Sequence, residues 1–271
     1  MIGFFDSGFG GLHILRRIAE RLPKYDYIYL GDSARAPYGP RTFDEVYAFT
    51  KQGVEFLFDR GAGLVVLACN TASSEALRKI QQGYQKEGGS KKVLGVLIPF
   101  AEAAAARTRN KRIGVMATEG TVLSGSFPRE IHKLDDTIAV FQQACPLLVP
   151  LVEAGQQDSA SADSLLHTYI APLLENNIDT LVLGCTHYGI LEEKIQKILG
   201  GDICVISDRD VMPESLARYL ERHQEWEQRI GKNGTVRFYC TGNTKTFNTL
   251  GGIFFEKAVE AEQVTLDAQA V

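Results

Sequence analysis

The stretch VVLACNTAS, residues 65–73, and its echo LVLGCTHYG, residues 181–189, decide the fold of this chain. Each begins as an apolar run long enough for a buried strand and then passes through one small residue to a cysteine. Polar residues that can donate hydrogen bonds follow at once. The same pattern, a strand followed by a cysteine and a polar loop, occurs twice, which predicts that the chain folds into two similar halves.

Short apolar runs rich in Val, Ile and aromatic residues recur along the chain and are predicted to be strands. They are residues 2–5, 27–30, 64–69, 93–98, 113–117, 138–141, 180–185, 203–206 and 236–240. Between them, stretches such as 12–22, 43–61 and 161–177 place apolar residues three and four positions apart, as amphipathic helices do. Strands that alternate with helices indicate an α/β fold with parallel sheets covered on both faces.

The order of these elements repeats along the chain. In each half a strand ends in a polar loop, DSGFGG (6–11) or TEGT (118–121), and a cysteine loop follows at nearly equal spacing. The length of 271 residues also exceeds the usual size of a single-core domain. We therefore expect two α/β lobes, 1–98 with 207–271 and 99–206, with a linker near 98–100. The C-terminal run 236–240 is expected to rejoin the first lobe.

Composition and charge exclude several classes of protein. Apolar residues make up 45% of the chain and charged residues 23%, which is ordinary globular composition. The net charge of −4 and the scattered lysines and arginines argue against nucleic acid as a partner. The N-terminus reaches an acid at Asp6 too early for a signal peptide, and no segment approaches the roughly 20 apolar residues of a membrane span. We expect a soluble protein.

The five cysteines indicate a reducing compartment. Their number is odd, and three of them, Cys69, Cys185 and Cys204, close or lie within apolar runs, unlike a secreted disulfide framework. We therefore expect reduced thiols and a cytoplasmic location.

Cys69 and Cys185 are the first candidates for chemistry. Free cysteine is often a small buried hydrophobe, so a structural thiol is the simplest interpretation of either one alone. Each, however, precedes polar residues and a predicted helix, whose N-terminus favours thiolate. Two thiols at matching positions facing one small ligand could exchange a proton at a stereocentre, because one thiolate removes a proton while the opposite thiol supplies one.

Two other interpretations of these cysteines remain open. A structural zinc site usually needs four Cys or His ligands, and only Cys185 and His187 stand close together. A cysteine hydrolase could pair the same Cys185 with His187 as its base, but it leaves Cys69 without a task.

Three further loops follow predicted strands, where ligands of parallel sheets bind. Asp6 and Ser7 open a glycine-rich loop that lacks the GxGxxG pattern and the GKS/T ending, which weakens a nucleotide assignment. Its backbone N–H groups can hold a carboxylate, or Asp6 can simply cap a tight turn. The segment 31–41, with Tyr38 and Gly39 between prolines, is a rigid connection or a second anion-binding loop.

In the second half, Thr118 and Thr121 offer hydroxyls at the place equivalent to the glycine-rich loop. Glu153 follows an apolar run and on its own would be a solvated surface acid. Four histidines have no partner in sequence spacing and are predicted to be structural. They are His13, His132, His167 and His223.

Five motifs occur in order over nearly the whole chain. They are FDSGFGGL (5–12), GDSARAPYG (31–39), ACNTAS (68–73), PLLVPLVEAG (146–155) and GCTHY (184–188). Together they resemble the glutamate racemases, within the cofactor-independent aspartate/glutamate racemase family. The resemblance implies two α/β lobes related by a pseudo-twofold axis, with the active site between them. It also implies interconversion of L- and D-glutamate for bacterial peptidoglycan, without pyridoxal phosphate or metal, by a protein that is usually a homodimer.

The resemblance also assigns roles to residues. It implies that Cys69 acts on the Cα proton of D-glutamate and Cys185 on that of L-glutamate, with Asp6 and His187 flanking these thiols, contacting substrate and assisting proton movement. Glu153 matches the acid near the second thiol. The remaining matches bind substrate: Ser7, Tyr38 and Gly39 at the side-chain carboxylate, and Asn70, Thr71 and Thr186 at the α-amino and α-carboxylate groups.

The chain departs from the family pattern at two places. Gly189 stands where a proline usually follows GCTHY, and Ser207-Asp208 stands where an Asp-Ser pair is common. Neither departure touches a residue to which the resemblance assigns a catalytic role, so the departures bear on the stiffness of the loop beside Cys185 and on the crossing between lobes. Two rival functions remain: a racemase of aspartate, distinguished by a pocket of different length, and a catalytically silent amino-acid-binding protein.

Overall fold

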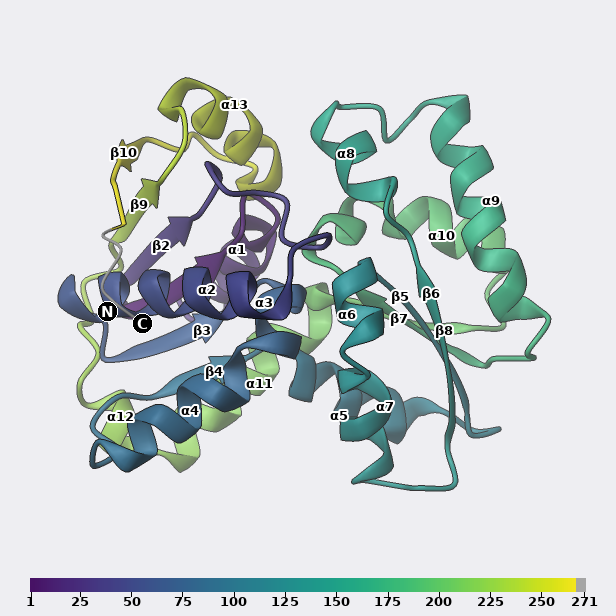
Figure 1. Ribbon diagram of the computed structural model, residues 1–271, viewed down its shortest axis with the longest axis horizontal. Coiled ribbons are helices and arrows are strands. Elements are labelled where there is room, and N and C mark those ends of the chain that lie inside the picture. The colour runs from purple at the N-terminus through teal and green to yellow at the C-terminus, as the bar shows by residue number, and fades with distance from the viewer. Residues whose placement is uncertain (267–271) are drawn as a thin grey trace.

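The structure, a computed structural model, describes residues 1–266 apart from the side chain of residue 210. The end of the predicted first lobe, residues 267–271, lies outside the described residues. The chain forms a six-stranded sheet and a four-stranded sheet, in which every pairing is parallel. Helices flank both sheets (Figure 1). The predicted α/β fold with two parallel sheets is therefore confirmed.

The strands follow one order in both sheets. The first sheet consists, in spatial order, of β10 (Ala261–Gln263), β9 (Val236–Cys240), β2 (Tyr27–Gly31), β1 (Ile2–Asp6), β3 (Leu64–Leu67) and β4 (Val93–Gly95). The second sheet consists of β6 (Ala139–Ala144), β5 (Arg112–Ala117), β7 (Thr180–Gly184) and β8 (Cys204–Ile206). The order β2-β1-β3-β4 is thus repeated as β6-β5-β7-β8, which makes β3 equivalent to β7.

Helices connect successive strands. In chain order they are α1 (Gly11–Arg21), α2 (Phe43–Asp59), α3 (Asn70–Glu75), α4 (Leu77–Lys86), α5 (Leu97–Arg107), α6 (Glu119–Leu123), α7 (Ser126–His132), α8 (Leu148–Glu153), α9 (Ala160–Leu174), the 3-10 helix η1 (Thr186–Leu191), α10 (Glu192–Leu199), α11 (Asp208–Arg222), α12 (Gln224–Glu227) and α13 (Thr244–Phe255). Side-chain caps stabilise the first turns of several of these helices. At the start of α2, the Thr42 hydroxyl accepts a hydrogen bond from the Glu45 N–H and the Glu45 carboxylate accepts one from the Thr42 N–H, and these two bonds form a capping box.

We call the six-stranded sheet with its helices the first lobe and the four-stranded sheet with its helices the second lobe. The C-terminal strand β9 pairs with β2, so the chain returns to the first lobe after β8. The exact division of the chain after residues 98 and 206 stays a prediction.

One predicted strand was too long. Residues 93–98 were expected to be extended, but β4 ends at Gly95 and α5 begins at Leu97. An apolar run by itself does not separate a strand from a buried helix. Here Leu97, Phe100 and Ala104 are buried at helical spacing, which decides the matter. The predicted linker at 98–100 is consequently part of a helix rather than a loop.

The two lobes share buried apolar surface. One continuous cluster extends from Phe4 in the first sheet through Leu15 of α1 and Leu216 of α11 to Val182 in the second sheet. A second cluster, which includes Phe5 and Val54, fills the space between the first sheet and α2. The lobe junction is therefore packed through α1, α5 and α11, and this packing fixes where the strand-end loops of the two lobes meet.

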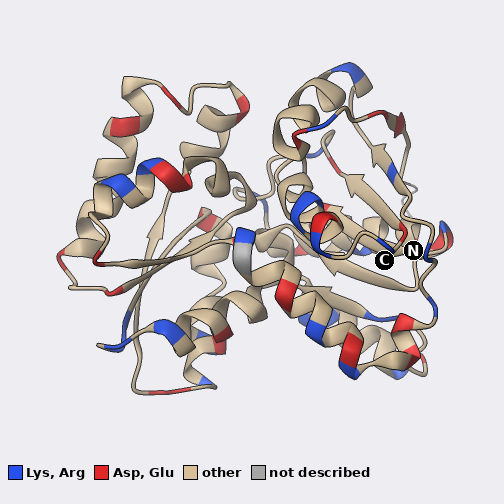
Figure 2. Ribbon diagram, turned by 180° about the vertical axis from the view of Figure 1, so that it is seen from behind, with Lys and Arg blue, Asp and Glu red and all other residues tan. Residues whose placement is uncertain are grey.

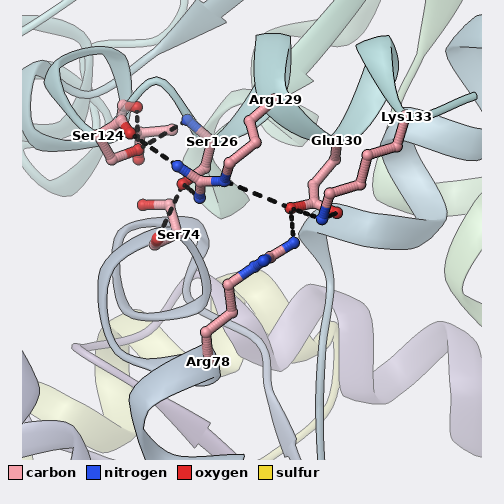
Figure 3. A network of polar contacts seen from close by, with 8 residues as sticks. Ser74, Arg78, Ser124, Ser126, Arg129, Glu130 and Lys133 are labelled. Carbon is pink, nitrogen blue, oxygen red and sulfur yellow. Dashed lines mark hydrogen bonds and ion pairs between the residues drawn. The ribbon is translucent and has the colours of Figure 1, made fainter. Parts of the chain in front are cut away.

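A polar network ties the lobes on the side of α4 and α7 (Figure 3). Glu130 on α7 forms ion pairs with Arg78 on α4 and, at 2.9 Å, with Lys133. The Ser126 hydroxyl donates to the carbonyl of Ser74 at 2.9 Å. These contacts couple the end of α3 and the start of α4 to the second lobe.

No helix in the described residues 1–266 is long and apolar enough to cross a membrane. Figure 2 shows acidic and basic residues interspersed on the helices of both lobes. This mixture agrees with the small net charge of −4.

Candidate active site

The carboxyl ends of two equivalent pairs of strands, β1 with β5 and β3 with β7, carry predicted functional residues. Asp6 ends β1, Cys69 closely follows β3, Thr118 follows β5 and Cys185 follows β7. Since β1 corresponds to β5 and β3 to β7, the two cysteines occupy the same place in the two lobes. Ligands of parallel α/β sheets bind beyond these strand ends.

Cys69 is buried, with 5% of its surface exposed, and caps the short helix α3. Its sulfur accepts a hydrogen bond from the Ala72 N–H at 3.5 Å, and its thiol donates to the Ser7 hydroxyl at 3.5 Å. Burial, followed by the charge of Asp6, raises the pKa of this thiol to about 11. The Ala72 N–H at the start of α3 lowers this pKa, as predicted for a helix N-terminus, but desolvation outweighs that effect.

Cys185 is similarly buried, with 8% exposed. The helix predicted after this cysteine is present and is the 3-10 helix η1. Its sulfur lies 3.9 Å from His187 Nδ1. Burial is the main cause that raises the pKa of the Cys185 thiol well above its usual value, and the charges of Cys69 and Asp6 act in the same direction. The two thiols are therefore within electrostatic reach of each other.

Cys185, His187 and Glu153 form a row. His187 Nε2 lies 3.0 Å from Glu153 Oε1 at the end of α8, while Nδ1 faces the sulfur and lies 3.5 Å from the Thr186 hydroxyl. The imidazole also contacts the ring of Phe254 edge-on, with 5.3 Å between centroids. A carboxylate on one ring nitrogen fixes the orientation of the other nitrogen toward its partner. The row can therefore pass a proton to or from Cys185.

Asp6 is fully buried. Its Oδ1 accepts from the Gly8 N–H at 2.8 Å, and its Oδ2 has no hydrogen-bond partner among the residues that the structure describes. Burial raises the pKa of this carboxyl, while the charge of His187 and the N–H groups of Gly8 and Gly11 lower it in part. The carboxyl is thus closer to taking up a proton at neutral pH than an exposed aspartate.

Loops of the two lobes touch beside these groups. The hydroxyl oxygens of Thr71 and Thr118 are 2.9 Å apart, and the Thr118 hydroxyl donates to the Thr121 hydroxyl at 3.0 Å. The Gly120 N–H donates to the carbonyl of Gly39 at 3.0 Å. A Cβ on Gly10 would lie only 2.9 Å from His187 Nδ1, so the glycine-rich loop also packs directly on the second cysteine loop.

The predicted substrate-binding side chains of Asn70 and Tyr38 differ in whether their polar groups already have a hydrogen-bond partner. Asn70 is buried, and its Oδ1 has no hydrogen-bond partner within the described part of the chain. The Tyr38 ring is buried as well, but its hydroxyl donates to Asp32. Asn70 thus keeps a free acceptor, whereas only the backbone around Tyr38 and Gly39 is left to contact a ligand.

The structure adds residues that the sequence did not single out. Asp32 also accepts from the Thr241 hydroxyl at 2.7 Å and lies 2.7 Å from Arg35, so it fixes the Tyr38 loop. Its place directly after β2 was the available signal. His13, predicted to be structural and without a partner in sequence spacing, pairs with Asp208, which is 195 residues away in the sequence.

Glu75, the last residue of α3, was not anticipated either. Both of its carboxyl oxygens are buried without a hydrogen-bond partner among the described residues, and burial raises its pKa to about 8. It lies against Gly120 of the second lobe, where an added Cβ would be 2.5 Å from Oε1. No three His, Cys, Asp or Glu side chains within residues 1–266 come together so as to hold a metal ion.

Comparisons with known proteins agree with this arrangement. The sequence profile described as Asp/Glu/Hydantoin racemase matches residues 2–208. A glutamate racemase of Streptococcus agalactiae is 36% identical over 270 residues, which cover 98% of both chains. The crystal structure of a glutamate racemase isoform from Bacillus anthracis matches with a TM-score of 0.90 at 35% identity, covering 98% of this chain and 97% of that chain.

A second solved structure, glutamate racemase from Francisella tularensis in complex with D-glutamate, gives a TM-score of 0.89 at 31% identity, covering 99% and 98% of the two chains. Fold and relatives together define an isomerase of the amino-acid racemase class. The chain belongs to the Asp/Glu/Hydantoin racemase family. The resemblance to glutamate racemases expected from the five motifs is thereby confirmed, while the roles of the individual site residues stay predictions.

Proposed function

We propose that this protein is a glutamate racemase that interconverts L- and D-glutamate by proton transfer between two cysteines. The observation that carries the proposal is the pair Cys69 and Cys185: two buried thiols at equivalent strand ends of facing lobes, within electrostatic reach of each other. The relatives from Streptococcus agalactiae and Bacillus anthracis, both named glutamate racemase, support the choice of substrate.

The reaction needs one thiolate and one thiol. For L-glutamate, the Cys185 thiolate takes the Cα proton, the electron pair of the broken C–H bond moves toward the α-carboxylate, and the Cys69 thiol then protonates Cα from the opposite face. For D-glutamate the two thiols exchange tasks. Each turnover leaves the protonated and unprotonated cysteines exchanged, so one proton must be redistributed before the next turnover in the same direction.

The raised pKa values of the two thiols make substrate binding part of thiol activation. A buried thiol is held neutral by desolvation. The ammonium group of glutamate brings a positive charge beside the sulfur atoms, which favours thiolate. Asp6 Oδ2 and Asn70 Oδ1 are buried acceptors without partners in the described residues, and an ammonium group supplies the donors that such atoms need.

The groups beside each thiol suit proton movement. Asp6, whose pKa is raised by burial, serves the Cys69 side. The row from His187 to Glu153 serves the Cys185 side. Donors that receive the charge developing on the α-carboxylate lower the barrier most, and we assign this task to the buried hydroxyls of Thr71 and Thr186.

The side-chain carboxylate of the substrate is assigned to the glycine-rich loop and the Tyr38 loop. Ser7 presents its hydroxyl beside Cys69, and the backbone at Tyr38 and Gly39 contributes N–H groups rather than the bound Tyr38 hydroxyl. Thr118 and Thr121 complete this wall from the second lobe. Aspartate is one methylene shorter, so its side-chain carboxylate would not reach this wall while its Cα lies between the two thiols.

The wider role follows from the reaction. D-Glutamate is a constituent of bacterial peptidoglycan, so we propose that the enzyme supplies it for cell-wall synthesis in the cytoplasm. We also propose that it acts without pyridoxal phosphate or metal, as a homodimer of two-lobed subunits divided at residues 1–98 with 207–271 and 99–206.

The direct test is incubation of the purified protein, treated with a chelator and free of pyridoxal phosphate, with L-glutamate in D₂O. Optical rotation and Cα deuterium are followed, with L-aspartate in parallel. Racemisation with solvent deuterium in the product supports the proposal. Turnover of aspartate alone would mean that the substrate is aspartate, and no turnover of either amino acid would favour an amino-acid-binding protein.

The row Cys185–His187–Glu153 also suits a cysteine hydrolase. A covalent acyl group on Cys185 after incubation with a glutamyl ester would identify that activity.

A further inference from the structure

A second buried histidine–carboxylate pair lies at the lobe junction. His13 on α1 and Asp208, the first residue of α11, are 6% and 4% exposed. His13 Nδ1 lies 3.2 Å from Asp208 Oδ1 and 3.3 Å from Oδ2. Asp208 also lies at the N-terminus of a 15-residue helix, where the free N–H groups favour negative charge. Both side chains are therefore fixed by their mutual contact and by burial.

The backbone of the second cysteine loop rests on this pair. A Cβ added to Gly189, in η1, would lie 3.1 Å from His13 Nδ1 and 3.2 Å from Asp208 Oδ1. These separations are tighter than ordinary van der Waals contact, so glycine is what allows the loop to approach.

The position of this contact gives it a specific consequence. Gly189 belongs to the same short 3-10 helix as His187 and directly follows Tyr188, whose hydroxyl donates to the carbonyl of Cys145 at 3.0 Å. The loop that carries Cys185 is thus held by the second lobe through Tyr188 and by α1 and α11 through Gly189. The Cys69 loop meets α1 at a different residue, Gly11, where an added Cβ would lie 2.9 Å from the Cβ of Ala68.

We propose that His13 and Asp208 are positioning residues that hold the Cys185 loop, and that they affect proton transfer at Cys185 but not at Cys69. This inference rests on the proposed racemase activity. A sulfur that is displaced by a fraction of an ångström from the Cα proton transfers it more slowly, since reaction depends steeply on near-attack geometry. The Cys69 half-reaction uses a different loop and should keep its rate.

The test compares His13→Ala and His13→Asn, with His167→Ala on the exposed face of α9 as control. Primary isotope effects on kcat/KM are measured with L-[2-²H]glutamate and D-[2-²H]glutamate. In His13→Ala we expect kcat to fall about tenfold. The isotope effect should rise with the L-isomer, because the L-isomer loses its proton to Cys185 and that step becomes slower. It should fall with the D-isomer, because the D-isomer loses its proton to Cys69 and that step then limits the rate less. His13→Asn, which restores a donor toward Asp208, should recover most of the loss.

A second measurement does not need turnover. Alkylation of Cys185 and Cys69 by iodoacetamide is followed by mass spectrometry in the same variants and in Gly189→Ala, which presses on the pair without removing it. A changed rate at Cys185 with an unchanged rate at Cys69 supports the proposal even if the wild-type protein racemises nothing, in which case only the proposed function has failed. Equal changes at both thiols, or wild-type behaviour of His13→Ala, would overturn it.

Discussion

Thr71 and Thr118 hold their hydroxyl oxygens 2.9 Å apart, although one follows Cys69 in the first lobe and the other follows β5 in the second. This contact joins the strand-end loops of two separate sheets. Threonine hydroxyls can both donate and accept, so the pair can exchange its mutual hydrogen bond for bonds to a ligand. A ligand that reaches either hydroxyl must lie at the junction, within reach of groups from both lobes.

Replacement of either central thiol should abolish racemisation. Cys69→Ala and Cys185→Ala each remove one of the two groups that must act on opposite faces of Cα, so we expect kcat to fall by at least about a thousandfold. The fold should persist, because each substitution removes only one small atom at a strand end. Racemisation is measured by polarimetry and folding by circular dichroism. Full activity in either variant would reject the two-thiol mechanism.

Each half-reaction should also be separable. In Cys69→Ser and Cys185→Ser the remaining thiol still faces one enantiomer. We expect Cys185→Ser to retain more deuterium exchange into D-glutamate, whose proton Cys69 removes, and Cys69→Ser to retain more into L-glutamate. Nuclear magnetic resonance of each enantiomer in D₂O measures this, and equal exchange in both variants would contradict the assignment of faces.

The reactivity of Cys69 should depend strongly on pH. Its pKa is raised to about 11, so the reactive thiolate is a small fraction at neutral pH and grows about tenfold per pH unit up to that value. The rate of Cys69 alkylation by iodoacetamide should therefore still rise between about pH 9 and about pH 10, where a free cysteine levels off. A plateau below pH 9 would show that the thiol is less desolvated than the structure indicates.

The sequence predicted the fold well because buried parallel strands are continuous apolar runs and repeated devices mark equivalent strands. Cys69 and Cys185 were found for this reason, since each closes such a run. The strand at 93–98 was too long because Leu97 and Ile98 are apolar in either conformation, and tertiary packing made them the start of α5.

The site was less predictable where its contacts and pKa values depend on groups distant in sequence or on burial. His13 and Asp208 meet only after folding, so no spacing could pair them. The raised pKa values of Cys69 and Cys185 also follow from burial of the whole junction, whereas the sequence shows only the local helix start that acts in the opposite direction. Local electrostatics can be predicted from neighbours in sequence, but desolvation cannot.

Glu75 should make the protein less stable at alkaline pH. Its pKa is raised from 4.5 to about 8 by burial. The folded state thus keeps a proton that the unfolded state releases above about pH 4.5, so stability is full below this pH and falls as pH rises toward 8. We expect Glu75→Gln to be more stable than wild type by about 1–2 kcal/mol at pH 8 and to show no gain at pH 4. Urea unfolding at both pH values measures this, with the exposed Glu87→Gln as control.

Glu130 should be the most sensitive position of the network that joins α4 and α7. Its side chain is 10% exposed and faces Arg78, Lys133 at 2.9 Å and, at 3.6 Å, Arg129. Glu130→Gln leaves three positive groups together without a compensating charge, so we expect a loss of about 2–3 kcal/mol.

Arg78→Ala, in contrast, removes a half-exposed cation and should cost less than about 1 kcal/mol. Urea unfolding at about 0.1 M and about 1 M salt tests both, since repulsion among the three cations weakens as salt screens it. The loss in Glu130→Gln should therefore shrink at high salt. Equal losses in the two variants, or a Glu130→Gln loss that salt leaves unchanged, would mean that charge at this position does not hold the lobes together.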